Sequence, residues 1–228
     1  HQVRGAACAA SAARNSAGGM GALRQRPYFL LYLGKTKGGT LPGQRVRGDS
    51  NVAALDPGLT VIATGWRASA FTKAEVYDSP FGRFFAAMGQ IPLRRGDEAS
   101  TDWALDQARR ILAAGGVIGV YPEGTRGPDD DALYRLHHRV LVPLLRESPE
   151  VPVHALAIRY RPARPRVHVR LAVSERLTIE PQSMTDADMV RVITEALMEL
   201  GGFRFVDQYA LVAKARLARE QGRGSTGR

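Results

Sequence analysis

The stretch YPEGTRG, residues 121–127, places a carboxylate, a hydroxyl, a guanidinium and two glycines directly after an apolar run. Gly124 allows a tight turn and a close approach of the backbone to a ligand, and Thr125 supplies a hydroxyl and an amide donor. Arg126 offers a planar guanidinium that suits a phosphate. These three residues together predict an anion-binding site.

Glu123 is the residue that restricts the choice of ligand. A carboxylate beside a phosphate repels it, unless the carboxylate pairs with a nearby arginine or accepts hydrogen bonds from ligand hydroxyls. A ligand with both a phosphate and hydroxyl groups, such as a glycerol phosphate, satisfies both conditions. The alternative is a surface turn in which Glu123 and Arg126 only pair with each other, and the residue types alone do not decide between the two.

The segment before YPEGTRG indicates how the chain positions it. Ser100 lies where a helix N-cap is expected, and apolar residues at helical spacing follow until Gly115-Gly116. These apolar residues are Trp103, Ala104, Ala108, Ile111 and Leu112. Residues 117–121, VIGVY, then have the length and composition of a strand buried on both faces. We therefore expect YPEGTRG at the carboxyl end of a core strand, where open α/β sheets bind their ligands.

The rest of the chain continues the alternation of strands and helices. The elements expected downstream are two strands at 151–160 and 166–174, a helix from about 185 to 201 and a last helix from about 203 to 217. Thr185 and Asp188 form a capping-box-like helix start, and Gly201-Gly202 end that helix. This order predicts a single α/β domain, with a mixed, mostly parallel sheet flanked by helices.

Charge divides the chain into three parts. The formal net charge is +10, and residues 1–48 contain eight basic residues and no acidic one. We expect residues 1–48 to be a disordered or atypical N-terminal extension, residues 49–212 to be the folded domain and residues 213–228 to be a basic disordered tail. Because the basic residues gather at the ends, residues 49–210 carry a slightly negative formal charge. Basic ends favour peripheral contact with an anionic membrane surface.

Several other classes of function are disfavoured. No nucleic-acid partner is expected, because the chain has no recognised binding motif and its aromatic content is 7%. Cys8 is the only cysteine, which excludes an internal disulfide, and no metal site is expected. No apolar run reaches the roughly 18 residues that a spanning helix needs. The first 25 or so residues lack the apolar segment of a secretory signal.

The segment YPEGTR closely resembles the Phe-Pro-Glu-Gly-Thr-Arg block of the phospholipid/glycerol acyltransferase family, the 1-acylglycerol-3-phosphate acyltransferases. Other segments are similar to family blocks in the same order. They are Lys73-Ala74-Glu75, the block Gly89 to Arg95 with Arg95 in its arginine place, Val151-Pro152-Val153, and Phe205 to Ala210 near the end. The resemblance covers about residues 50–212.

The resemblance implies an enzyme that transfers a fatty acyl group to the free hydroxyl of lysophosphatidic acid or a related acceptor. The donor is an acyl-coenzyme A or acyl-carrier-protein thioester, and no other cofactor is implied. Arg95 and the corner of Glu123, Gly124, Thr125 and Arg126 are implied to hold the phosphate and glycerol. Such an enzyme acts in the cytoplasm, at the inner face of the membrane.

The family's His-x-x-x-x-Asp block is altered in this chain. Its histidine removes the proton of the acceptor hydroxyl and its aspartate orients the imidazole, which is the base half of a Ser-His-Asp triad. Counting back from Asp56, the histidine position holds Asn51. An asparagine amide is not basic near pH 7, so Asn51 can hydrogen-bond the hydroxyl without taking its proton. Asp56 is a weak substitute base.

The remaining histidines offer uncertain replacements for the missing base. His154 lies within a strand and is expected to be structural, and His168 is expected to be solvated. His137 and His138 follow the YPEGTR block and are expected at a solvent-facing helix start, and a helper role for either is left open. The approach to Asn51, residues 41–50, is also too polar for the family's first strand, so that strand is expected to be malformed or missing.

Two functions therefore remain open from the sequence. The first is an acyltransferase of phospholipid synthesis whose activity is impaired by Asn51. The second is a catalytically inactive module that binds phospholipid headgroups or membrane surfaces through the phosphate corner and the basic ends.

Overall fold

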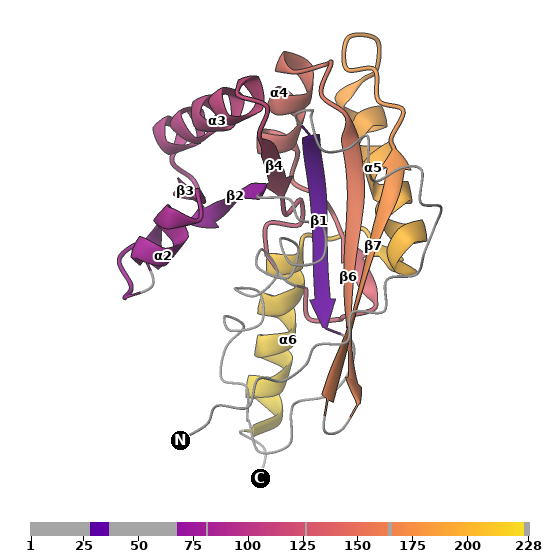
Figure 1. Cartoon of the computed structure of the whole chain (residues 1–228). Helices are drawn as coiled ribbons and strands as arrows, with labels where there is room; N and C mark the ends of the chain where they lie inside the picture. The colour runs from indigo at the N-terminus through magenta and orange to yellow at the C-terminus, as the bar shows by residue number, and fades with distance from the viewer. Residues whose placement is uncertain (1–27, 37–67, 81, 126, 164–165, 226–228) are drawn as a thin grey trace.

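A computed structural model of the chain describes residues 28–36, 68–80, 82–125, 127–163 and 166–225 (Figure 1). The strands are β1 (Tyr28–Thr36), β2 (Ala68–Lys73), β3 (Ile91–Leu93), β4 (Val117–Val120), β5 (Ala132–Tyr134), β6 (Val153–Ala163), β7 (Arg166–Arg176) and β8 (Arg204–Val206). The helices are the 3-10 turn η2 (Ala74–Val76), α2 (Gly82–Ala87), α3 (Glu98–Ala113), α4 (His138–Glu147), α5 (Asp186–Gly201) and α6 (Ala210–Ser225).

Within the described residues, six strands form one sheet in the order β3-β2-β4-β1-β6-β7. Every neighbouring pair from β3 to β6 is parallel, and β7 alone pairs antiparallel, with β6. A second, two-stranded parallel sheet joins β5 to β8. The expected α/β class with a mixed, mostly parallel sheet and flanking helices is confirmed.

One continuous core packs helices α3, α4 and α5 against the sheet. Each helix contributes a buried stripe, for example Ala108 on α3, Leu144 on α4 and Ile193 on α5, all 0% exposed. The stripes meet β4 and β6, whose residues Ile118 and Ala155 are also fully buried. Each Å² of apolar surface buried in this way contributes about 25 cal/mol to the stability of the fold. This burial is the main contribution that holds the sheet, and with it any site at the ends of its strands, in place.

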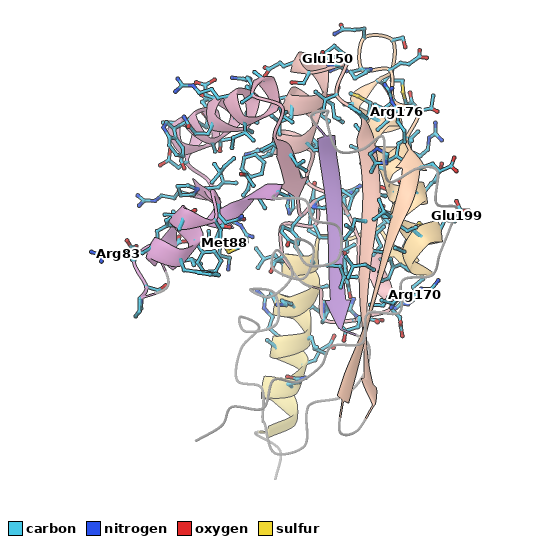
Figure 2. All side chains as sticks on the ribbon, in the orientation of Figure 1. Arg83, Met88, Glu150, Arg170, Arg176 and Glu199 are labelled. Carbon is cyan, nitrogen blue, oxygen red and sulfur yellow. The ribbon has the colours of Figure 1, made fainter. Side chains whose placement is uncertain are left out.

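Charged side chains lie mostly on the outer surface. In Figure 2 the labelled Arg83, Arg170 and Glu199 point away from the body of the molecule, and all three are exposed. No helix in the described part of the chain has both the length and the hydrophobicity needed to cross a bilayer.

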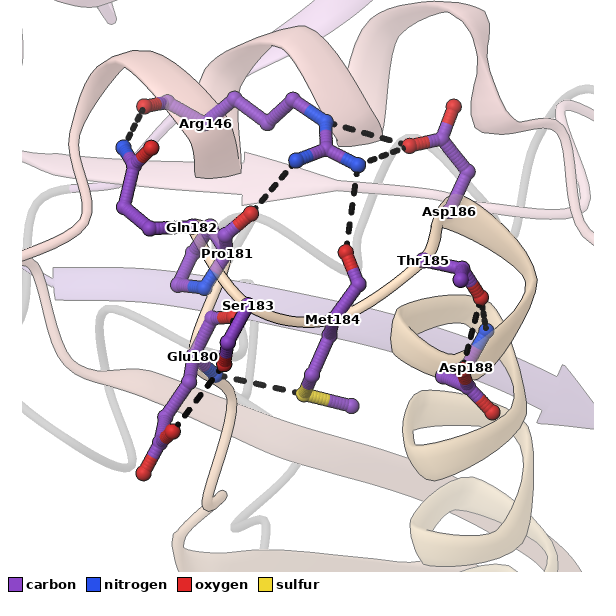
Figure 3. A network of polar contacts seen from close by, with 9 residues as sticks. All are labelled: Arg146, Glu180, Pro181, Gln182, Ser183, Met184, Thr185, Asp186 and Asp188. Atoms are coloured by element: carbon purple, nitrogen blue, oxygen red, sulfur yellow. Dashed lines mark hydrogen bonds and ion pairs between the residues drawn. The ribbon is translucent and has the colours of Figure 1, made fainter.

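A polar network fixes the entry to α5 against α4 (Figure 3). Arg146 of α4 donates to the carbonyl oxygens of Pro181 and, at 3.3 Å, Met184, and its guanidinium also contacts Asp186. The expected capping-box-like start is present, because Thr185 is the N-cap of α5, its side chain accepts from the Asp188 N–H at 3.1 Å, and its hydroxyl donates to Asp188 Oδ2 at 2.7 Å. Gly202 ends the helix at φ +61°.

The N-terminal part of the fold differs from the expectation. Residues 1–48 were expected to form an extension and the first strand to be malformed or missing. Instead Tyr28–Thr36 form β1, which lies between β4 and β6 and pairs in parallel with both. The apolar run YFLLYL at its start has the composition of such a central strand. The expected strands at 117–121, 151–160 and 166–174 are confirmed as β4, β6 and β7.

The C-terminal elements also differ from the expectation. The predicted helix start at Phe203 is wrong, because residues 204–206 are the strand β8 and the helix begins at Ala210. The expected disordered tail from residue 213 is instead largely helical, since α6 extends to Ser225. Its Ala, Leu and Arg residues are good helix formers, and Ala213 packs beside Ala132 of β5. The N-cap of α3 is Asp97 rather than Ser100, whose N–H Asp97 accepts at 3.0 Å.

Candidate active site

Three adjacent parallel strands bring separate segments to one edge of the sheet. β3, β2 and β4 are neighbours in that order, so their carboxyl ends point the same way. Lys73 is the last residue of β2, Arg95 follows β3 by two residues, and residues 121–125 follow β4 directly. The sheet therefore gathers three segments that are far apart in sequence.

A pocket of about 300 Å³ opens at this edge, and the described residues that line it are Lys73, Glu75 and Arg95. All three side chains are exposed. Two cations and one carboxylate around a pocket of this size suit a ligand that carries both an anionic group and hydrogen-bond donors.

Gln90 holds β3 and the Arg95 segment in place. Its side chain is 5% exposed and takes the place of a strand neighbour for β2, accepting from the Ala70 N–H and donating to the Ala68 carbonyl, both at 3.2 Å. The Tyr77 hydroxyl donates to the Gln90 carbonyl at 2.5 Å. Because a buried amide is costly to leave unpaired, this arrangement fixes the start of β3, and Arg95 follows two residues after the other end of this short strand.

The corner after β4 is a tight turn, as expected from Gly124. The Gly124 N–H donates to the Tyr121 carbonyl at 2.9 Å, and Gly124 has φ +67°. A Cβ at this position would lie 2.9 Å from Cδ2 of His137. The turn therefore needs glycine for two reasons, its backbone conformation and the close approach of the imidazole.

Arg95 reaches this corner directly. Its guanidinium donates to the Gly124 carbonyl, across a sequence separation of 29 residues. A guanidinium carries five N–H donors, so one bond to a carbonyl leaves others for a phosphate or a carboxylate. The expected meeting of Arg95 with the YPEGTR corner is thus present in the fold.

Glu123 faces inward, away from bulk solvent. It is 6% exposed, and its Oε1 accepts from the Tyr134 N–H of β5 at 2.6 Å. A buried carboxylate hydrogen-bonded to a backbone N–H holds the corner against β5. Glu123 is therefore not on an exposed surface turn, while Arg126, with which the alternative pairs it, lies outside the described residues.

His137 completes the described part of the corner. Its N–H donates to the Pro122 carbonyl at 2.7 Å, and its ring stacks on Tyr209, with centroids 4.6 Å apart and an angle of 12° between the planes. His137 and His138 lie at the start of α4 and are exposed, as expected. Partial desolvation against the corner nevertheless lowers the pKa of the His137 imidazole, and the positive charges of Arg95, His138 and Arg139 lower it further. The neutral imidazole is therefore favoured.

The C-terminal segment packs against this corner. The Arg135 N–H donates to the Gln208 carbonyl at 3.0 Å, and the Arg135 side chain pairs with Asp207 at 3.0 Å. The same guanidinium lies 5.5 Å from the centre of the Tyr209 ring. Together with the β5–β8 pairing, these contacts place residues 205–210 beside the site.

The structure brings together only some of the residues expected from the sequence. Arg95, Glu123, Gly124 and Thr125 lie at one corner, with Thr125 half-buried. Asn51, Asp56 and Arg126 lie outside the described residues. His154 has the structural environment expected for it, because it is 6% exposed and its Nδ1 lies 3.0 Å from the Ser174 carbonyl oxygen.

Sequence reasoning gave no site role to Lys73 or Tyr209, and it named His137 only as one of two histidines that could help. Lys73 and Tyr209 lie inside segments whose resemblance to the family was noted, which was the available signal. His137 had no such signal, because its place at the corner depends on the backbone bond to Pro122 and on the Tyr209 ring. No group of three or more potential metal ligands is present in the described part of the chain.

Part of the chain matches a protein-family model. Residues 56–158, just under half of the chain, match the model of the family described as Acyltransferase. No curated protein matches the chain. The matched segment contains β2, β3, β4 and the YPEGTRG corner, and therefore all of the pocket-lining residues named above.

Proposed function

We propose that the acyltransferase-family domain of this chain transfers a fatty acyl group from the thioester of coenzyme A or acyl carrier protein to the free hydroxyl of lysophosphatidic acid or a similar lysophospholipid, in phospholipid synthesis. The observation that carries the proposal is the meeting of Lys73, Arg95 and the Gly124 corner at one sheet edge, inside the segment that matches the family. Acyl transfer follows from the family, and the acceptor class follows from the charges at this edge.

The two cations would bind the phosphate of the acceptor. Arg95 would keep its bond to the Gly124 carbonyl and give its other N–H donors to phosphate oxygens, while Lys73 would supply a second positive charge. Holding the acceptor in this way places its hydroxyl beside the thioester, and such positioning is a large part of catalysis of two-substrate reactions.

Glu123, Thr125 and Arg126 support the acceptor at the corner in this proposal. The hydrogen bond from Tyr134 occupies one acceptor position of Glu123, and a carboxylate has about four such positions. Glu123 would therefore hold the corner in shape and would also accept from a glycerol hydroxyl of the acceptor. Asp56 and Asn51 are proposed to lie at the reacting hydroxyl, with Asn51 as a hydrogen-bond partner rather than a base.

The chemical step transfers the acyl group without a covalent enzyme intermediate. The acceptor oxygen attacks the thioester carbonyl carbon as its proton passes to a base, a new ester C–O bond forms, and the C–S bond breaks. The departing thiolate takes up the proton and leaves as the free thiol. No redox change or metal is needed to balance the reaction.

A membrane location is proposed on the basis of helix α6. Leu211 and Val212 are 62% and 50% exposed, and the helix also carries exposed Arg216 and Arg219. Exposed apolar and basic side chains on one helix suit the surface of an anionic bilayer. We propose that the chain acts in the cytoplasm as a peripheral protein on the inner face of the membrane.

The test is an assay of the full chain with palmitoyl-coenzyme A and lysophosphatidic acid, which follows both free thiol and phosphatidic acid. Arg95→Gln is expected to lower kcat/KM for the acceptor about 10- to 100-fold, because a hydrogen bond between charged groups contributes about 1.5–3 kcal/mol. Arg94→Gln is the matched control, since Arg94 is an exposed neighbour whose backbone N–H, not its side chain, donates to Ser100 Oγ.

The outcomes separate the two functions left open by the sequence. Phosphatidic acid formed in step with thiol, and lost in Arg95→Gln but not in Arg94→Gln, supports the acyltransferase. Saturable binding of lysophosphatidic acid with no thiol release, from either coenzyme A or carrier-protein thioesters, would show an inactive lipid-binding module instead.

The membrane location has its own test in the sedimentation of vesicles that contain phosphatidylserine. Arg219→Gln is expected to weaken binding, and raised salt is expected to weaken it further. Arg191→Gln on α5 removes the same charge from a helix whose stripe packs in the core. Equal losses in the two variants would contradict a role for α6.

A further inference from the structure

The histidine position of the altered block holds Asn51, so the reaction proposed above has no imidazole at its usual place. His137 is the described histidine that lies at the corner with Arg95 and Gly124. We infer that His137 accepts the proton of the acceptor hydroxyl, and that Tyr209 is the positioning residue that holds its ring. This inference rests on the proposed function.

The orientation of the ring supports this role. A Cβ on Gly124 would lie 2.9 Å from Cδ2 and 3.3 Å from Nε2 of His137, so the Cδ2–Nε2 edge of the imidazole faces the corner. Gly124 is also the residue whose carbonyl accepts from Arg95. A phosphate held by Arg95 would thus place the rest of the acceptor close to Nε2.

His137 is held through both its backbone and its ring. Its backbone N–H donates to the Pro122 carbonyl inside the corner, and its imidazole stacks on Tyr209 from the C-terminal segment. Residues 205–210, which resemble a family segment but have no role in the proposal so far, gain one as the support of this ring. A fixed ring is what a general base needs, because proton transfer requires hydrogen-bond distance and direction.

The charges around His137 favour its basic form. Partial desolvation of the exposed His137 ring opposes its protonation first, and Arg95 from the loop before α3 and His138 and Arg139 from α4 oppose it as well. On the C-terminal side, the Arg135–Asp207 pair flanks Tyr209. The free imidazole is therefore neutral near pH 7, with a lone pair to accept a proton. A bound phosphate would offset the charge of Arg95 and raise the pKa of His137 as the proton arrives.

The step balances without another reactant. The lone pair of Nε2 takes the hydroxyl proton, and the electron pair of the O–H bond becomes available for the new C–O bond of the ester. The C–S bond breaks, its electrons leave with sulfur, and the imidazolium returns its proton to the thiolate. His137 is neutral again at the end of each turnover.

The test compares His137→Gln with His138→Gln, in full-length protein, because the two histidines are neighbours at the same helix end and are both exposed. His137→Gln is expected to lower kcat about 10²–10⁴-fold with little change in KM, and to abolish the acid limb of the pH–rate profile. His138→Gln should keep both. Tyr209→Phe should keep the stacking and the rate, whereas Tyr209→Leu should lower kcat. Circular dichroism checks that each variant is folded.

A second measurement separates a base from a structural residue. Added imidazole should restore part of the rate of His137→Ala, because it replaces the missing base, and it should not affect wild type. Asn51→His should raise the rate more when it is added to the His137→Gln variant than when it is added to wild type, because the His137→Gln variant lacks a base and wild type does not.

The results that overturn the inference differ from those that overturn the proposed function. Wild type that transfers no acyl group refutes the proposed function, and the inference with it. Active wild type together with a His137→Gln variant that keeps its kcat and its acid limb refutes the inference alone. A folded but slow His137→Ala variant that imidazole does not rescue also refutes it.

Discussion

Gly124→Ala tests whether the corner depends on the packing of the imidazole as well as on the turn. A non-glycine residue in the left-handed region costs about 1–2 kcal/mol, and Gly124 has φ +67°. The new Cβ would also meet His137 Cδ2 at 2.9 Å, which is closer than real Cβ contacts allow. His137 must shift to make room, which disturbs its stack on Tyr209, and a stacked ring pair contributes about 0.5–1.5 kcal/mol.

Gly115→Ala is the matched control, because Gly115 has φ +78° and an added Cβ there meets nothing within 4 Å. Both variants are expected to be destabilised by the cost of placing alanine at a positive φ. Only Gly124→Ala is expected to lose stability from the disturbed stacking of His137 on Tyr209 as well. The added loss of about 1 kcal/mol corresponds to a further fall in Tm of roughly 2–4 °C for a domain of this size.

Thermal unfolding followed by circular dichroism measures both variants and wild type. A Gly124→Ala variant that is no less stable than Gly115→Ala would refute the reasoning that His137 is fixed against the corner. The same variant should also bind lysophosphatidic acid more weakly, while Gly115→Ala should bind it as wild type does.

Three further predictions concern single interactions. Glu123→Ala should lower the free energy of unfolding by about 1–3 kcal/mol in urea denaturation, because it leaves the buried Tyr134 N–H unpaired, whereas Glu123→Gln keeps an acceptor oxygen and should lose less. Thr185→Ala should cost about 1 kcal/mol by removing the N-cap of α5, while Thr185→Ser should be near neutral. Wild type should lose stability as the pH falls below about 6.5, because the unfolded state binds the His137 proton more readily than the folded state, whose pKa is lowered. Urea midpoints measured at several pH values should show this loss reduced much more in His137→Gln than in His138→Gln, which removes only one of the charges that lower the pKa of His137.

Much of the fold follows from local pattern. Residues 117–121 and 151–160 were expected as buried strands, because short continuous apolar runs can satisfy a sheet that is covered on both faces. The helix from Thr185 to Gly202 was expected with both ends, because a hydroxyl N-cap and a left-handed glycine fix helix ends through bonds to neighbouring residues. Such features depend on residues close together in the chain.

The misplaced elements depend on distant partners. The apolar run that begins β1 was passed over, and only its pairing with β4 and β6 makes it the middle of the sheet. Residues 204–206 were expected to be helical, yet their partner β5 lies about seventy residues earlier and holds them extended. Local propensity differs by too little to overrule such long-range pairing.

The sequence by itself determined the turn at Gly124, the cationic and hydroxyl groups of the corner, and the resemblance that names a reaction. Only the tertiary structure decided that Arg95 contacts Gly124, that Glu123 is buried against β5, and that His137 lies on Tyr209. The physical reason is that residue types fix which bonds a side chain can make, whereas the parallel order of β3, β2 and β4 fixes which side chains are near enough to make them.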